Sequence, residues 1–130
     1  MFTIQDIHNA HAKVKSGADF PKYIQDIIQI GVTDFETFVS DSHTVYFGED
    51  NYQTQSAPMY APLSIADKSA KEQFVRYLKI HQRGETDYPS FCKHCAETGI
   101  EKWVVNMQQM TCIYYNKEGE KVLVEKIPSL

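Results

Sequence analysis

The chain has 130 residues, 42% of them hydrophobic, and its 13 basic and 17 acidic residues give a formal net charge of −4. This length and composition predict one domain, residues 1–130, that buries a sizeable core without disulfides or a structural metal. No dense Lys/Arg cluster is present, which argues against nucleic acid as a main partner, and no apolar run approaches the roughly 18 residues of a membrane helix.

Apolar residues at helical spacing predict two helices at the start of the chain, over about 3–15 and 20–30. Thr3 suits the N-cap of the first helix, which ends before Ser16-Gly17. Asp19 suits the N-cap of the second helix. The proline two residues later fits a first helical turn, because the N–H group that it lacks would have no partner there.

Residues of β-branched and aromatic type follow from Val32 to Phe47 and predict two strands. Ser40-Asp41-Ser42 interrupts them and predicts the turn of a hairpin. A weaker, polar strand is expected near Tyr52–Gln55. The connector beyond it contains two prolines and leaves room for a short edge strand at 63–65, since proline excludes a central strand.

The second half of the chain begins with two further predicted helices. The pattern Ser69-x-x-Glu72 predicts a capping box that opens a third helix, and Asp87-Tyr88-Pro89 opens a fourth, which ends at Gly99. Three strands are then expected, with a turn at 116–119 between the last two, over 100–107, 110–115 and 121–127.

The two halves repeat one pattern. Asp19-Phe20-Pro21-x-Tyr23 recurs as Asp87-Tyr88-Pro89-x-Phe91, 68 positions later (87 − 19), and the match continues without a gap into the strands. The chain thus reads as two copies of one α-α-β-β-β unit, about 1–57 and 66–130. A unit of about 65 residues buries too little surface to be comfortably stable alone, so the halves should share one core. Antiparallel hairpins covered by helices predict a two-layer α+β fold.

The motif Cys92-Lys93-His94-Cys95 suggests either half of a zinc site or a redox pair. Under the repeat, however, its cysteines correspond to Ile24 and Ile27 on the apolar stripe of the second helix, so we expect them in the core. No second Cys/His cluster accompanies the motif, and we expect neither a metal nor a cofactor. An odd number of cysteines, three, together with the lack of a signal-peptide pattern, predicts a cytoplasmic protein without a membrane partner.

Reactive residue types gather in the second half and define one candidate site. His81, Asp87, Tyr88, Cys112 and Tyr114 would line the cleft of a small, hydrolase-like enzyme. Each also has a structural explanation, since Asp87 caps a helix, His81 lies near a helix carboxyl end, and the strand residues pack in the core. The preferred hypothesis is therefore a non-catalytic binding or regulatory module for an unknown protein or small-molecule partner. The enzyme is the alternative, and the sequence leaves the oligomeric state open.

A resemblance to a known family rests on four segments: Ser16–Pro21, His81–Tyr88, Gly99–Val105 and Met110–Tyr115. In combination they resemble the YdfO-like and YbcV-like family of bacterial and prophage-encoded proteins, over nearly the whole chain. The resemblance implies a two-layer α+β domain of unknown function and supplies no catalytic residues, and the prophage-encoded relatives suggest that the binding module acts in phage–host interplay. Some relatives carry the label phage envelope protein, but neither an apolar segment nor an export signal here supports an envelope location.

Overall fold

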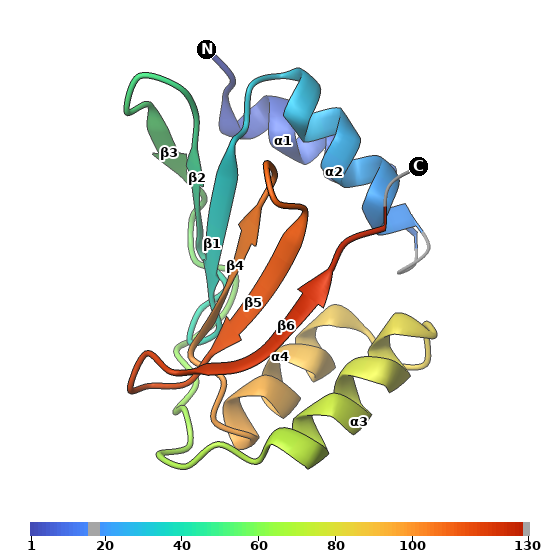
Figure 1. The fold of residues 1–130 in the computed structure, drawn as a ribbon, viewed down its shortest axis with the longest axis vertical. Coiled ribbons are helices and arrows are strands. Elements are labelled where there is room, and N and C mark those ends of the chain that lie inside the picture. Colours follow the sequence, from blue (N-terminus) through green and yellow to red (C-terminus); the bar gives the residue numbers. More distant parts are fainter. Residues whose placement is uncertain (16–18, 129–130) are drawn as a thin grey trace.

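The computed structural model describes residues 1–15 and 19–128, which fold into a layer of helices and a sheet (Figure 1). The described residues form four helices: α1 (Ile4–His11), α2 (Phe20–Gln29), α3 (Lys71–Gln82) and α4 (Tyr88–Glu97). They also form six strands: β1 (Asp34–Phe38), β2 (Thr44–Phe47), β3 (Gln53–Gln55), β4 (Lys102–Asn106), β5 (Thr111–Tyr115) and β6 (Lys121–Lys126). The predicted α+β class is confirmed.

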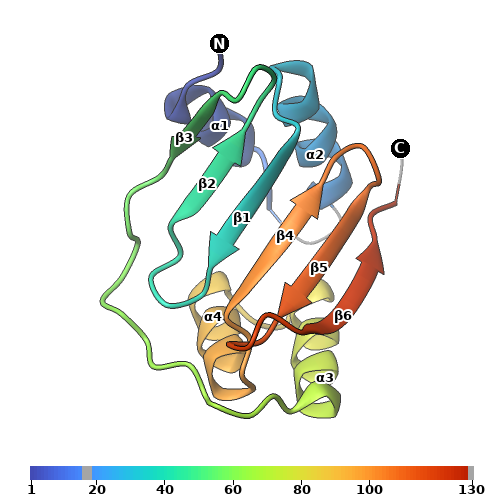
Figure 2. The same cartoon turned by 60° about the vertical axis from the view of Figure 1, so that its left-hand side comes forward.

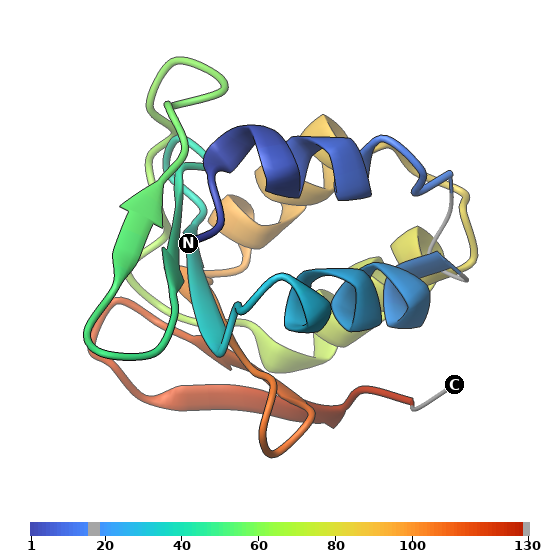
Figure 3. The ribbon, with the colours of Figure 1, turned by 90° about the horizontal axis from the view of Figure 1, so that it is seen from above.

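The strands form one antiparallel sheet in the order β3-β2-β1-β4-β5-β6 (Figure 2). All of the described helices lie on the same side of this sheet, which curves around them (Figure 3). At its centre β1 pairs with β4, and Phe35 lies opposite Val105. The opposite side of the sheet is therefore covered by no helix or strand within residues 1–15 and 19–128.

The order of elements is α-α-β-β-β in the first half and again in the second. β1 begins 68 residues before β4 (102 − 34), and α2 begins 68 residues before α4 (88 − 20). Each half also runs outward from the centre of the sheet, as β1-β2-β3 on one side and β4-β5-β6 on the other. The expected repeat of elements is present, while descent from a duplicated ancestor stays a prediction.

The first helix is shorter than the sequence predicts. Thr3 caps α1 as expected: its side chain accepts a hydrogen bond from the backbone N–H of Asp6, whose carboxylate accepts one from the N–H of Thr3. The helix ends at His11, whereas the apolar pattern continued to residue 15. Val14 still reaches the core because tighter i,i+3 hydrogen bonds, such as that from its N–H to the carbonyl of His11, continue the turn. The predicted end at Ser16-Gly17 lies outside the described residues.

The two later helix starts differ in how well the sequence predicts them. Asp87 caps α4, because its carboxylate accepts a 2.8 Å hydrogen bond from the backbone N–H of Ser90. The predicted Ser69 capping box is wrong: α3 begins at Lys71 after Ala70, with no side-chain cap among the described residues. The Ala70 N–H donates instead to the carbonyl of Thr98, 2.9 Å away, so the segment is held by the end of α4.

The carboxylate of Asp19, the predicted cap of α2, accepts a 2.8 Å hydrogen bond from the backbone N–H of Lys15. Among the described residues it forms no cap bond to the first turn of α2. The predicted edge strand at 63–65 is also wrong. The N–H of Leu63 donates to the carbonyl of Ser40, and that of Met59 to the carbonyl of Asp41, so the connector bonds to the β1–β2 turn.

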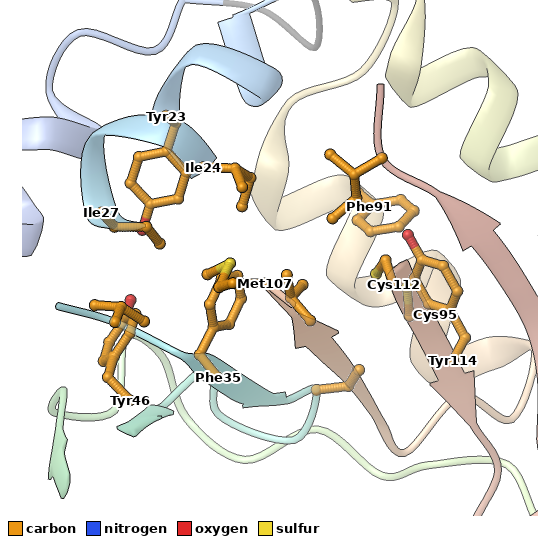
Figure 4. Packing of buried hydrophobic residues seen from close by; sticks show 14 of the residues in the cluster. Tyr23, Ile24, Ile27, Phe35, Tyr46, Phe91, Cys95, Met107, Cys112 and Tyr114 are labelled. Carbon is orange, nitrogen blue, oxygen red and sulfur yellow. The ribbon is translucent and has the colours of Figure 1, made fainter. Parts of the chain in front are cut away.

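Both halves contribute to one cluster of buried hydrophobic residues (Figure 4). Ile24 and Ile27 of α2 and Cys92 and Cys95 of α4 are all 0% exposed. The expectation that these cysteines occupy core positions is confirmed, while their equivalence to the isoleucines under a duplication stays a prediction. All three cysteines are free thiols.

Candidate functional site

His81 and Asp87, the first two residues of the predicted site, lie at the connection between α3 and α4. The Nδ1 atom of His81 is 3.2 Å from both the carbonyl oxygen and the hydroxyl of Thr86, and its ring stacks on Phe91 with centroids 4.4 Å apart. Burial lowers the pKa of His81, so the imidazole is neutral near pH 7. The Asp87 carboxylate is exposed, and its hydrogen bonds to Ser90 lower its pKa. Both side chains organise the helix junction.

Tyr88 points to a different region, the turn between β1 and β2. Its hydroxyl lies 2.6 Å from the hydroxyl of Ser42, which is 2% exposed. The hydroxyl of Tyr60, in the connector, donates to the carbonyl of Val39 in the same turn. Both tyrosine hydroxyls also interact with the sulfur of Cys92, and burial raises the pKa of this thiol. These contacts join the turn, the connector and α4, so they explain Tyr88 structurally.

Cys112 and Tyr114 lie on the helix-facing side of β5, inside the core (Figure 4). The ring of Tyr114 is 4.9 Å from that of Phe74. Burial raises the pKa of Cys112 to about 12 and the pKa of Tyr114 well above its ordinary value. A thiol in this state carries almost no thiolate at neutral pH and is a poor nucleophile.

The five predicted residues thus divide into three places: the α3–α4 connection, the β1–β2 turn and the core. Two open depressions of the described surface lie elsewhere, one between α1 and α2 and the other at the start of α3. Neither includes any of the five. The described residues also contain no group of three or more His, Cys, Asp or Glu side chains placed to hold a metal ion.

The side of the sheet without helices carries a surface that the sequence-based reasoning missed. Paired residues on neighbouring strands share a face, and the helix-facing row is marked by buried Phe35, Tyr46 and Val105. The alternate residues form the open face. Its apolar members are Phe38, Val45, Phe47, Val104, Ile113, Tyr115 and Val124, and its charged members are Asp34, Glu36, Lys102, Lys121 and Lys126.

Lys102 lies on the open face at one end of the central strands, opposite Phe38 of β1 and Tyr115 of β5. Its ammonium group is 3.3 Å from the carboxylate of Glu36, 5.7 Å from the centroid of the Phe38 ring and 5.5 Å from that of the Tyr115 ring. The Phe38 ring stacks on His43 with centroids 4.6 Å apart. Cation–π contacts of this length are attractive. This end of the open face is therefore ordered by its own contacts.

Most apolar side chains of the open face are partly exposed, and Val124 is 52% exposed. A signal for this surface was present in the sequence. Neighbouring strand residues such as Val104 and Val105, or Cys112 and Ile113, are apolar on both sides of the sheet, which is typical of a strand covered on both faces. Within the described residues, helices cover only one of the two faces of the sheet.

The fold and this surface define a two-layer α+β domain with one uncovered sheet face. The chain belongs to the family described as protein of unknown function (DUF1398), whose family model matches residues 8–126. A search of curated proteins finds no match to the chain. No helix within the described residues is long and apolar enough to cross a membrane.

Proposed function

We propose that this chain is a non-catalytic binding module and that the open face is its interaction surface. One observation carries the proposal: the open face presents seven apolar side chains on the side of the sheet that the described chain leaves uncovered. Contiguous exposed apolar surface of this kind marks interaction sites in soluble proteins. The five residues of the enzyme hypothesis lie in three separate places and their contacts are structural, which favours binding over catalysis.

The shape and charge of the open face support a protein as the partner. Small ligands bind in concave pockets, whereas the sheet curves around the helices and turns the convex side of its backbone outward as the open face (Figure 3). The open face mixes two carboxylates with three ammonium groups and the chain has a net charge of −4, so it lacks the clustered positive charge that a nucleic-acid partner requires. A protein with apolar and charged side chains matches both features.

A site-specific photo-crosslinker tests the proposal in cells. We place it at Val124, on the open face, and at Lys79, an exposed residue of α3 on the helix side, as a matched control. The proposal predicts a protein adduct from position 124 and none from position 79. Val124→Glu combined with a crosslinker at Ile113 should lose the adduct without loss of folding. Equal labelling from both faces, or none from either, would contradict the proposal.

We further propose that the chain is a single folding unit, residues 1–130, that arose by duplication of an α-α-β-β-β unit. Support comes from the repeated element order and from a hydrophobic cluster to which both halves contribute. Residues 1–57 or 66–130 expressed alone should then be unfolded by circular dichroism, because each half would expose its side of the cluster. A half that folds cooperatively by itself would contradict the single unit.

A cytoplasmic location and a role in phage–host interplay complete the proposal. Three free thiols support a reducing compartment. The phage connection, and membership of the YdfO-like and YbcV-like group within the wider family, are supported by the resemblance of the four sequence segments. Cell fractionation tests the location. The positions of the coding genes inside or outside prophages test the phage connection.

A further inference from the structure

The charges of the open face are divided between the two halves of the sheet. Among the described strands, β1–β3 contribute two carboxylates to this face, Asp34 and Glu36, and no cation. β4–β6 contribute three ammonium groups, from Lys102, Lys121 and Lys126, and no carboxylate. The face is thus acidic on one side of the β1–β4 pair and basic on the other.

This division makes the open face complementary to itself. Consider a two-fold axis that runs parallel to the strands over the β4–β5 pair, between two sheets packed face to face. It places β1 of one copy over β6 of the other, and the reverse contact occurs at the same time, as in any two-fold interface. Asp34 lies at the same level of the sheet as Lys126, so the carboxylate of each copy faces an ammonium group of the other, while Val104 and Ile113 meet at the centre.

We infer that a second copy of this chain covers the open face and that the protein is a dimer through its sheets. The inference rests on the proposed function, because it names the partner of the same surface. Sheets that pack face to face lie about 10 Å apart and interdigitate their side chains. The helices would then form the two outer layers of the dimer. A partner of uniform charge would be attracted by one half of the face and repelled by the other, whereas a second copy satisfies both.

Charge reversal provides the test, because the two halves can be changed separately. One variant, Asp34→Lys with Glu36→Gln, makes the acidic half basic. The other, Lys121→Glu with Lys126→Glu, makes the basic half acidic. Either variant alone faces like charges across the interface, and we expect its self-association to weaken about tenfold or more. In an equimolar mixture each altered half faces an opposite charge again, so dimers of one variant with the other should form.

Size-exclusion chromatography coupled to light scattering measures the molecular mass of the assembly. It is run over a range of protein concentrations at low and at high salt. The inference requires a dimeric wild type, weaker dimers of each variant and recovery in the mixture. Circular dichroism shows whether each variant is folded. The single change Val124→Glu, at a side chain already 52% exposed, adds a carboxylate to the basic half and keeps the test decisive if a double variant fails to fold. It should also weaken the dimer.

Three results would overturn the inference: a wild type that is monomeric at every concentration, a dimer that resists all of these changes, or a mixture no more associated than its components. The crosslinker at Val124 separates this failure from that of the proposed function. An adduct with a different protein, formed by a monomeric wild type, rejects the second copy and leaves the open face as a binding surface. No adduct of any kind rejects both.

Discussion

The ammonium group of Lys102 on β4 lies 3.3 Å from the carboxylate of Glu36 on β1, across the strand pair that joins the two halves of the chain. Both side chains are about 30% exposed, at 29% and 28%, so solvent screens their attraction. Glu36→Gln should lower the free energy of unfolding by roughly 0.2–1 kcal/mol at low salt. Urea unfolding at two salt concentrations measures this, and the difference from wild type should shrink at high salt. A larger loss that salt does not change would show that packing, not charge, dominates.

The contact between the Tyr88 and Ser42 hydroxyls should be measurable as a coupling energy. Removing either hydroxyl, by Tyr88→Phe or Ser42→Ala, leaves the other partly buried without its partner and should cost about 1–2 kcal/mol. The double variant should cost clearly less than the sum, because the second change removes a group already unpaired. Tyr115→Phe removes a hydroxyl from a half-buried ring of the open face and is the control, expected to change stability by less than about 0.5 kcal/mol. Additive losses would argue against the contact.

Alkaline pH should destabilise the protein through its buried thiols. Cys112 has a pKa raised from 9.0 to about 12 by burial, so between these values the unfolded chain loses a proton that the folded chain keeps. The contribution of this buried thiol to the free energy of unfolding is therefore fully present below pH 9 and decreases as the pH rises toward 12. For one thiol, the free energy of unfolding falls by about 1.4 kcal/mol for each pH unit within this window. Urea unfolding from pH 8 to 10.5 should show a slope that is shallower in Cys112→Ala. An unchanged slope would mean that Cys112 ionises in the folded protein.

Two glycines with positive φ form a matched pair for measuring a steric clash. At Gly84, with φ of +78°, a Cβ atom would meet nothing within 4 Å, so Gly84→Ala should cost about 1 kcal/mol from backbone strain alone. At Gly99, with φ of +84°, a Cβ atom would lie 2.7 Å from the carbonyl oxygen of Lys68. Gly99→Ala should therefore cost clearly more, by roughly a further 1–3 kcal/mol. Equal losses in thermal or urea unfolding would show that the segment before α3 can move away.

Local chemistry explains which elements the sequence predicted well. The cap at Asp87 and the turns at 40–42 and 116–119 depend on residues within a few positions of one another, and all are present. The Ser69 cap is absent because α3 begins two residues later, after Ala70, whose N–H donates to the carbonyl of Thr98 at the end of another helix. A local pattern gives no weight to a partner that is distant in the sequence.

The candidate site was less predictable than the fold. Its five residues were chosen for their chemical type, and the structure distributes them over three places because neighbours distant in sequence set their directions: Ser42 for Tyr88, and Phe74 for Tyr114. The open face depends on which side of each strand the helices cover. Spacing within a strand separates its two sides but does not say which one is covered, so the open face was not predicted.

By itself, the sequence determined the periodicity of its helices and strands, most of their ends, and the core positions of Cys92 and Cys95, because these follow from bonding and packing over one or two turns. Only the tertiary structure decided that β1 pairs with β4 and that every described helix covers the same side of the sheet. The same long-range pairing brought Glu36 beside Lys102 and separated acidic from basic strands. These features depend on contacts between segments about 68 residues apart, whose formation is set by the competition between chain entropy and burial over the whole molecule.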